Sequence, residues 1–474
     1  MKKRLSGPRA KTLLVINTGT FCDGSLMEDA LKTLQNYNII YVTDEKLVPN
    51  DKNIVHKLHT YRTPPFVYMD PSKGAADPTR SVLAWAMAHP VYAKQVNGWI
   101  SMLGEMIYGA EKMYSPDCVL VNFSLTAALL AAERQKAGVL GTVPHVMLYF
   151  IPGVPNASIP WLFDGRLRLR DFKLYEDNTA DIVLDSWKVM LHRFSMTGNL
   201  SENDESNIRS TSCSLRDIHH ALCWDPSITC PLRELVPGLA TEFVGSLVDK
   251  TPPRLAHRRL ISDGVREFLD KNKKNKVAFI SFGSVGHDVK LRSIMRSLFA
   301  ELPKYGYAIL FHDTSSQRQP NNNSFDSSAS ILVHHGHIPY DVIVPVVNLV
   351  VFTGTLCLQL KCLLNIVPML FVPLMTEQYF WAKNYEHFTG ITYVDVNEDY
   401  PDVQRALKDI SLTRKIKKAA RYMAVVRQSM LRSKSDVNFK KMISRVITDY
   451  RKKKAYKGLV SSDDNKQLRK IPVK

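Results

Sequence analysis

The chain contains little cysteine, with only 7 cysteines among its 474 residues. A secreted fold held together by disulfides would carry a denser set, and usually an even number. The sequence therefore excludes a disulfide framework. It predicts reduced thiols inside a cell and hence a cytoplasmic protein.

The sequence has no long apolar run free of helix-breaking residues. The first run, Leu13 to Ile16, is four residues long, whereas the apolar part of a signal peptide needs roughly 7 to 15 residues. The most apolar stretch, Val342 to Met375, has an uncharged part, Val342 to Leu360, but this part contains Pro345 and is followed by Lys361. Because a membrane span needs about 20 apolar residues, we expect buried strands and helices in both places.

Generic catalytic motifs are also missing. No Walker loop, GxGxxG, HExxH or GxSxG sequence occurs in a supporting context, which argues against the enzyme classes that use them. The 45% hydrophobic content still excludes a disordered or fibrous chain. At roughly 100 to 200 residues per domain, the length predicts two or three globular domains.

Acidic residues are scarce only near the C-terminal end. From Ser411 to Lys474 there are twenty basic and four acidic residues, so this segment carries +16 of the net charge of +18. Apolar residues recur there every three or four positions, which predicts a pair of helices. The few aromatic residues disfavour nucleic-acid binding. Two interpretations remain open: a solvated basic face, or peripheral contact with an anionic membrane through the distal tail.

Short apolar runs alternate with helical periodicity, and the pattern restarts after a proline-containing segment near 249–259. Alternation of this kind predicts parallel sheets with crossover helices, so we expect an α/β fold with two facing Rossmann-like domains and a cleft between them. The expected strands are 13–16, 38–42, 118–122, 146–150, 277–281, 308–311, 331–334, 349–352 and 369–372, and a helix is expected at 125–136. The expected units are an N-terminal Rossmann-like domain (1–245), a linker (246–262), a C-terminal Rossmann-like domain (263–410), and basic helices with a tail (411–474).

A glycine and serine turn follows the strand at 277–281. Gly283 would let the backbone approach a ligand, and the amides and hydroxyl of Ser284 would hold phosphate oxygens. Such turns also close strands for purely steric reasons, so the motif alone does not define a site.

Five ordered segments between Glu242 and Asp395 give the second half a specific resemblance. They read FVGSLV, VREFLDKNKKNKVAFISFGSV, ILVHHGHIPYDVIVP, VVFTGTLCLQLKCLLNIVPMLFVPL and TEQYFWAKN. This half resembles UDP-sugar glycosyltransferases of the sterol glucosyltransferase and vancomycin-type branch. The N-terminal half resembles them more faintly, through GTFCDGSLMEDALKTL.

The resemblance implies the GT-B fold, with the basic C-terminal helices packed back across the first domain. It also implies an inverting, metal-independent hexosyltransferase. A UDP-sugar, with UDP-glucose as the favoured donor, would be a co-substrate and no cofactor would be needed. The acceptor would be an apolar, sterol-like or lipid-like alcohol.

Asp23 aligns with the aspartate of that family. A base must remove the proton of the acceptor hydroxyl, and a carboxylate after the first strand is a sensible place for it. The same residue would also serve as a cap for the following helix. Both roles stay open.

The diphosphate loop departs from the family sequence HHGGAGTT, because this chain reads FTGTLCLQ over 352–359. Thr353 and Gly354 remain as ligand-binding candidates. Losing an imidazole donor would cost on the order of 2 to 4 kcal/mol of transition-state stabilisation. Tyr340 also replaces a family histidine. An inactive GT-B protein that binds a nucleotide or a partner is therefore the alternative.

Glu377 and Gln378 stand where the family holds sugar hydroxyls, although a glutamate there also favours the start of a helix. A cysteine and histidine group in the first half does not have the spacing of a common zinc site, so no metal site is expected. That group comprises Cys213, His219, His220, Cys223 and Cys230.

Overall fold

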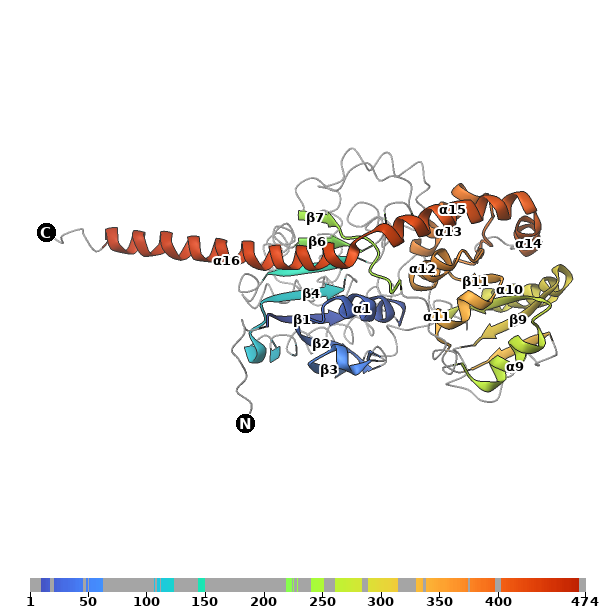
Figure 1. Cartoon of the computed structure of the whole chain (residues 1–474), viewed down its shortest axis with the longest axis horizontal. Helices are drawn as coiled ribbons and strands as arrows, with labels where there is room; N and C mark the ends of the chain where they lie inside the picture. The colour runs from blue at the N-terminus through green and yellow to red at the C-terminus, as the bar shows by residue number, and fades with distance from the viewer. Residues whose placement is uncertain are drawn as a thin grey trace, which may run out of the picture.

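The computed structural model consists of two parallel sheets with flanking helices and a long C-terminal helix pair (Figure 1). It describes residues 10–17, 21–45, 48–49, 51–62, 106, 109–110, 112–122, 144–149, 219–223, 225, 228, 240–250, 261–283, 289–313, 330–335, 338–373, 376–396 and 402–468.

The first sheet has the strand order β3-β2-β1-β4-β5-β6-β7, with all pairs parallel. Leu13 to Ile16 in β1 are buried on both faces, which explains their continuous apolar run. Helix α1 (Phe21–Thr33) follows β1, and a short 3-10 turn, Lys52–Ile54, precedes β3. The strands are β1 (Thr12–Asn17), β2 (Asn38–Asp44), β3 (Lys57–Tyr61), β4 (Cys118–Asn122), β5 (His145–Tyr149), β6 (His219–Leu222) and β7 (Ala240–Phe243).

The second sheet repeats this winding in the order β10-β9-β8-β11-β12, again with parallel pairs. Its strands are β8 (Lys276–Ser281), β9 (Tyr307–His312), β10 (Ile331–His334), β11 (Leu349–Phe352) and β12 (Met369–Phe371). Its helices are α9 (Asp263–Lys271), α10 (Val289–Glu301), α11 (Tyr340–Ile343), α12 (Leu356–Asn365), α13 (Thr376–Thr389) and α14 (Val403–Ser411), with 3-10 turns at Leu302–Tyr305 and Val344–Val346.

Each sheet reverses its winding direction at one point. In the first sheet this switch point lies between β1 and β4, and in the second it lies between β8 and β11. Ligands of doubly wound sheets bind outside the carboxyl ends of the strands at such points. The topology therefore directs attention to the residues that follow β1, β8 and β11.

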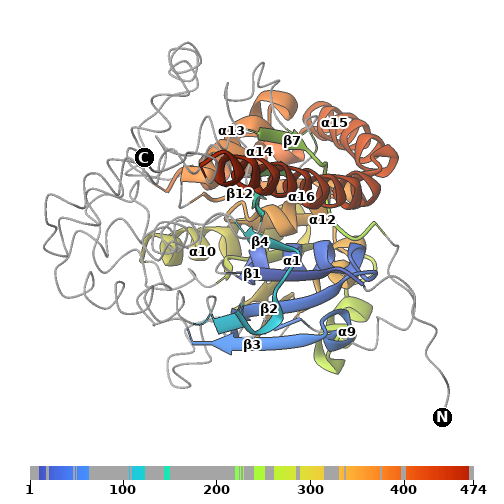
Figure 2. The same ribbon diagram turned by 90° about the vertical axis from the view of Figure 1, so that its left-hand side faces the viewer.

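Two C-terminal helices connect the two halves. Helix α15 (Thr413–Arg432) packs on α12, α13 and α14, whereas α16 (Ser435–Leu468) contacts α1 and crosses the first sheet (Figures 1 and 2). Arg445 and Arg451 of α16 form ion pairs with Glu242 and Asp117 of the first half. The helices thus follow the course that the resemblance implies, and part of their positive charge is neutralised by the first domain.

In the part of the chain that the structure describes, no helix is long and apolar enough to cross a membrane.

Candidate functional site

The switch point of the second sheet brings together predicted residues that are far apart in sequence. In the parallel register Ser281 of β8 lies beside Phe352 of β11. Gly283 and Gly354 each follow two residues later, so the two turns emerge side by side at the carboxyl edge. Both glycines have left-handed backbone angles, with φ of 61° and 103°, which an L-residue adopts only at a cost.

Gly354 sits in a tightly packed position. A Cβ atom there would lie 3.1 Å from Cδ1 of Phe371 and 3.2 Å from Cβ of Gln378. Thr353 is 1% exposed and Gln378 is 5% exposed. The structure therefore packs the turn after β11 directly against the first turn of α13. This contact brings together Thr353, Gly354 and Gln378, three of the residues that were predicted to bind the ligand.

Helix α12 begins immediately after this turn. Thr355 is its N-cap residue, with φ of −65° and ψ of 129°, and within the described residues its side chain makes no capping hydrogen bond. The first amides of a helix carry partial positive charge and attract anions. The start of α12 can therefore hold a diphosphate oxygen through main-chain donors, although the loop sequence differs from the family pattern.

The apolar residues of this loop that differ from the family sequence are part of the hydrophobic core. The Phe352 ring lies 4.7 Å from that of Phe371, and Leu356, Cys357 and Leu358 are all buried. These substitutions thus add to the packing of α12 on the sheet.

A hydrogen-bonded group that sequence reasoning missed lies next to Gly283. The hydroxyl of Ser281 is 3.2 Å from Nδ1 of His312 and 3.4 Å from the hydroxyl of Tyr340. Ser281 pairs with His312 in the register of β8 and β9. This group places an imidazole and a phenol at the carboxyl edge of the sheet. Its only sequence signal was Tyr340, which stands where the family has a histidine.

Gln359 of α12 was also missed as a candidate. Its side chain is 2% exposed, and among the described residues its Oε1 atom has no hydrogen-bond partner. A buried acceptor without a partner is costly. The sequence signal was a lone amide in the apolar helix LCLQLKCLLN.

The switch point of the first sheet is fixed by tyrosines. Nδ2 of Asn17 donates to the hydroxyl of Tyr41 over 3.0 Å, and the hydroxyl of Tyr61 donates to the Asn17 carbonyl over 2.8 Å. Burial raises the pKa of Tyr41 to about 12, so its hydroxyl keeps its proton at neutral pH. These bonds hold the end of β1 from which the turn towards α1 departs.

The remaining predicted residues are only partly defined. Asp23 lies in the first turn of α1, which begins at Phe21. This backbone position differs from the expected one before the helix, but the Asp23 side chain lies outside the described residues. Ser284 and the side chain of Glu377 also lie outside them. Among the described residues, no group of three or more His, Cys, Asp or Glu side chains is arranged to hold a metal ion.

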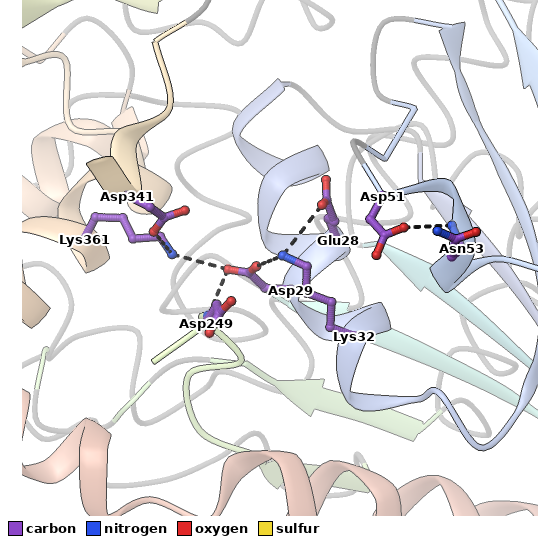
Figure 3. A network of polar contacts seen from close by, with 8 residues as sticks. All are labelled: Glu28, Asp29, Lys32, Asp51, Asn53, Asp249, Asp341 and Lys361. Atoms are coloured by element: carbon purple, nitrogen blue, oxygen red, sulfur yellow. Dashed lines mark hydrogen bonds and ion pairs between the residues drawn. The ribbon is translucent and has the colours of Figure 1, made fainter. Parts of the chain in front are cut away.

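The two domains meet through α1 and α12, the helices that follow the two switch-point strands. Nζ of Lys361 on α12 lies 2.5 Å from Asp341 and 3.6 Å from Asp29 of α1 (Figure 3). Asp29 also accepts the Asp249 amide over 2.9 Å and pairs with Lys32 over 3.2 Å. Lys361 and Asp29 are buried at the centre of this network, which joins the two halves beside the site.

No known family's sequence profile matches the chain, and no curated protein matches it in sequence. Solved structures do match. The chain is 12% identical, with a TM-score of 0.59, to a UDP-glucosyltransferase from Polygonum tinctorium that can glucosylate indoxyl. It is 13% identical, again with a TM-score of 0.59, to Phytolacca americana UGT2, complexed with UDP-2fluoro-glucose and pterostilbene. The spinosyn forosaminyltransferase SpnP matches at 10% identity and a TM-score of 0.55.

Each of these matches covers 93% of this chain and 100% of the other. The shared architecture is that of GT-B glycosyltransferases, two Rossmann-like α/β domains in tandem. The chain therefore has the GT-B fold.

Proposed function

We propose that the protein is a UDP-sugar-dependent glycosyltransferase that transfers a hexosyl group, with UDP-glucose as the favoured donor, to a hydroxyl of an apolar acceptor. The observation that carries the proposal is the packing of Thr353, Gly354 and Gln378 at the second switch point, beside Gly283. The GT-B fold and the five family-like segments support the same conclusion.

The donor would bind at the second sheet. The turns after β8 and β11 and the first amides of α12 would hold the diphosphate, with Thr353 offering a hydroxyl. Glu377 and Gln378 would bind the sugar hydroxyls from the start of α13. The structurally similar UGT2 of Phytolacca americana is complexed with a UDP-sugar analogue and pterostilbene, which supports a donor of this class.

The transfer would be a single inverting displacement without a metal ion. Asp23 would take the proton of the acceptor hydroxyl while the acceptor oxygen forms a bond to the anomeric carbon of the sugar. The bond from that carbon to the diphosphate oxygen would break at the same time, and UDP would leave with the electron pair. The amides of α12 would stabilise the charge that develops on the leaving group.

A sterol-like or lipid-like alcohol is the acceptor that the family-like segments favour. Contact with an anionic membrane would give access to such an acceptor, and a cytoplasmic location fits the reduced cysteines. The sequence alone supports the sterol-like or lipid-like acceptor, the membrane contact and the cytoplasmic location.

An Asp23→Asn variant tests the chemistry. With UDP-glucose and a sterol acceptor, we expect UDP release by the wild-type protein and at least a 100-fold lower rate in the variant, because a general base contributes about 10²- to 10⁴-fold. The affinity for UDP, measured by calorimetry, should stay unchanged in the variant. An undiminished rate would remove Asp23 from the mechanism.

One observation favours a second candidate function. The diphosphate loop has exchanged polar residues for apolar ones that are buried in the core, as expected of a protein that keeps the fold without the chemistry. Such a protein would bind a nucleotide or a partner and release no UDP. Screening several nucleotide-sugars for hydrolysis and transfer separates the two functions, because any specific turnover contradicts the inactive alternative.

A further inference from the structure

The outward face of α15 carries a row of basic side chains with no acidic residue among them. The helix has seven basic residues in twenty positions and no carboxylate. Its inner side, Ala419, Met423, Val426 and Met430, is buried. On the opposite side, steps of four and three residues align a row that spans about 27 Å at 1.5 Å per residue. We define this α15 stripe as Arg414, Lys418, Arg421, Val425, Gln428 and Arg432, all of which are exposed.

The charges of this stripe are not neutralised within the described part of the chain. Lys415, at the edge of the buried side, pairs with Asp409 over 2.6 Å, and Arg445 and Arg451 of α16 pair with carboxylates of the first domain. In contrast, none of the four basic residues of the α15 stripe pairs with a described carboxylate. They are therefore free to attract an external anion.

Aliphatic side chains accompany these charges. Val425, within the stripe, is 63% exposed, and Leu431, which directly precedes Arg432, is 45% exposed. Leu412, the N-cap residue of α15, and Val437, in the first turn of α16, are exposed as well. Basic residues with exposed aliphatic ones are typical of helices that lie in a membrane interface.

A nucleic acid is a poorer match for this surface. Single strands bind to aromatic side chains on which bases stack. Tyr422 is the one aromatic residue of α15, and its ring stacks on Phe388 at 4.8 Å while its hydroxyl donates to the Ile228 carbonyl over 3.1 Å. It is therefore committed to packing and offers no stacking surface.

We propose that the α15 stripe is a docking surface for an anionic lipid bilayer. The basic residues would contact lipid phosphates, and Val425 and Leu431 would enter the boundary between headgroups and acyl chains. This surface is separate from the distal tail beyond residue 452, and its binding does not depend on the transferase activity proposed above.

Co-sedimentation of the full chain with vesicles tests this proposal. The triple variant Arg414→Glu, Lys418→Glu and Arg421→Glu is compared with a matched control, Lys274→Glu, Arg292→Glu and Arg296→Glu. The control removes the same charge from exposed positions elsewhere on the second domain. Circular dichroism confirms that both variants fold.

We expect the wild-type protein to bind vesicles that contain phosphatidylserine and not vesicles of phosphatidylcholine alone. At about 1 kcal/mol per basic residue, the stripe variant should bind at least ~100-fold more weakly, while the control stays within about threefold of wild type. A Val425→Asn variant should also bind more weakly at high salt, where charge is screened.

Three outcomes would overturn the proposal. Equal losses in both triple variants would mean that net charge alone matters. Binding that is lost only when Lys452, Lys453 and Lys454 are reversed would place the contact in the tail. Stronger, stripe-dependent binding to single-stranded RNA than to the anionic vesicles would identify a nucleic-acid surface.

Discussion

Replacing Lys361 by methionine should destabilise the protein by about 2 to 4 kcal/mol. Burial by itself lowers the pKa of Lys361, but the carboxylates of Asp29 and Asp341 raise it more, so its pKa lies above the ordinary value and the side chain stays charged. Removing one partner of a buried ion pair typically costs about 3 to 5 kcal/mol, because a charge is left uncompensated. We expect a somewhat smaller cost here, since Asp29 keeps Lys32 and the Asp249 amide, and the Asp341 side chain is 55% exposed.

Urea unfolding at neutral pH measures this effect, and a surface pair provides the control. Lys304 lies 2.7 Å from Glu301 but its side chain is 64% exposed, so Lys304→Met should cost less than about 1 kcal/mol. Adding Asp29→Asn to Lys361→Met should restore part of the loss, because the buried carboxylate that has lost its Lys361 partner is then uncharged. If Lys361→Met and Lys304→Met lower the free energy of unfolding by the same small amount, the network between the two domains does not stabilise the protein.

Replacing Gly354 by alanine should cost about 2 to 6 kcal/mol of stability and weaken UDP binding more than tenfold. A residue with a side chain at this φ of 103° costs roughly 1 to 3 kcal/mol. The new methyl group would also meet Phe371 and Gln378 at 3.1 and 3.2 Å, and overpacking adds about 1 to 3 kcal/mol. Relief of this contact would move the turn after β11 away from the start of α13.

Gly306 is a matched control for this substitution. It also has a left-handed backbone, with φ of 79°, but no described atom lies within 4 Å of the position of an added Cβ. Gly306→Ala should therefore show only the backbone cost, about 1 kcal/mol, and unchanged affinity for UDP in calorimetric titration. If both variants lose the same stability and bind UDP equally well, the close packing of Gly354 is not important for the donor site.

Much of the architecture could be predicted because parallel strands buried on both faces form continuous apolar runs. The predicted strands at 118–122, 331–334 and 349–352 coincide with β4, β10 and β11, and the ends of the others lie within two residues of the observed ends. Strands β3, β6 and β7 were missed. Their sequences, KLHTY, HHAL and ATEF, are short and partly polar, and β3 and β7 are the edge strands of the first sheet. The predicted helix at 125–136 lies outside the described residues.

The site could be predicted only where a local motif defines it. Thr353, Gly354 and Gln378 were predicted because their segments resemble a family. The structure brings them together, and their binding role stays a prediction. The contact of Ser281 with His312 depends on the register between β8 and β9, which sequence spacing does not define. The pairing of Asp29 with Lys361 joins residues on two domains, and its only local signal is a lysine within an apolar helix.

Hydrogen–deuterium exchange with and without UDP tests most directly whether a nucleotide-sugar binds at the carboxyl edge of the second sheet. We expect slower exchange at saturating UDP in the peptides that contain the end of β8 with Gly283 and the start of α12 with Gly354. Unchanged exchange in both peptides, or protection confined to the first sheet, would contradict binding at this edge.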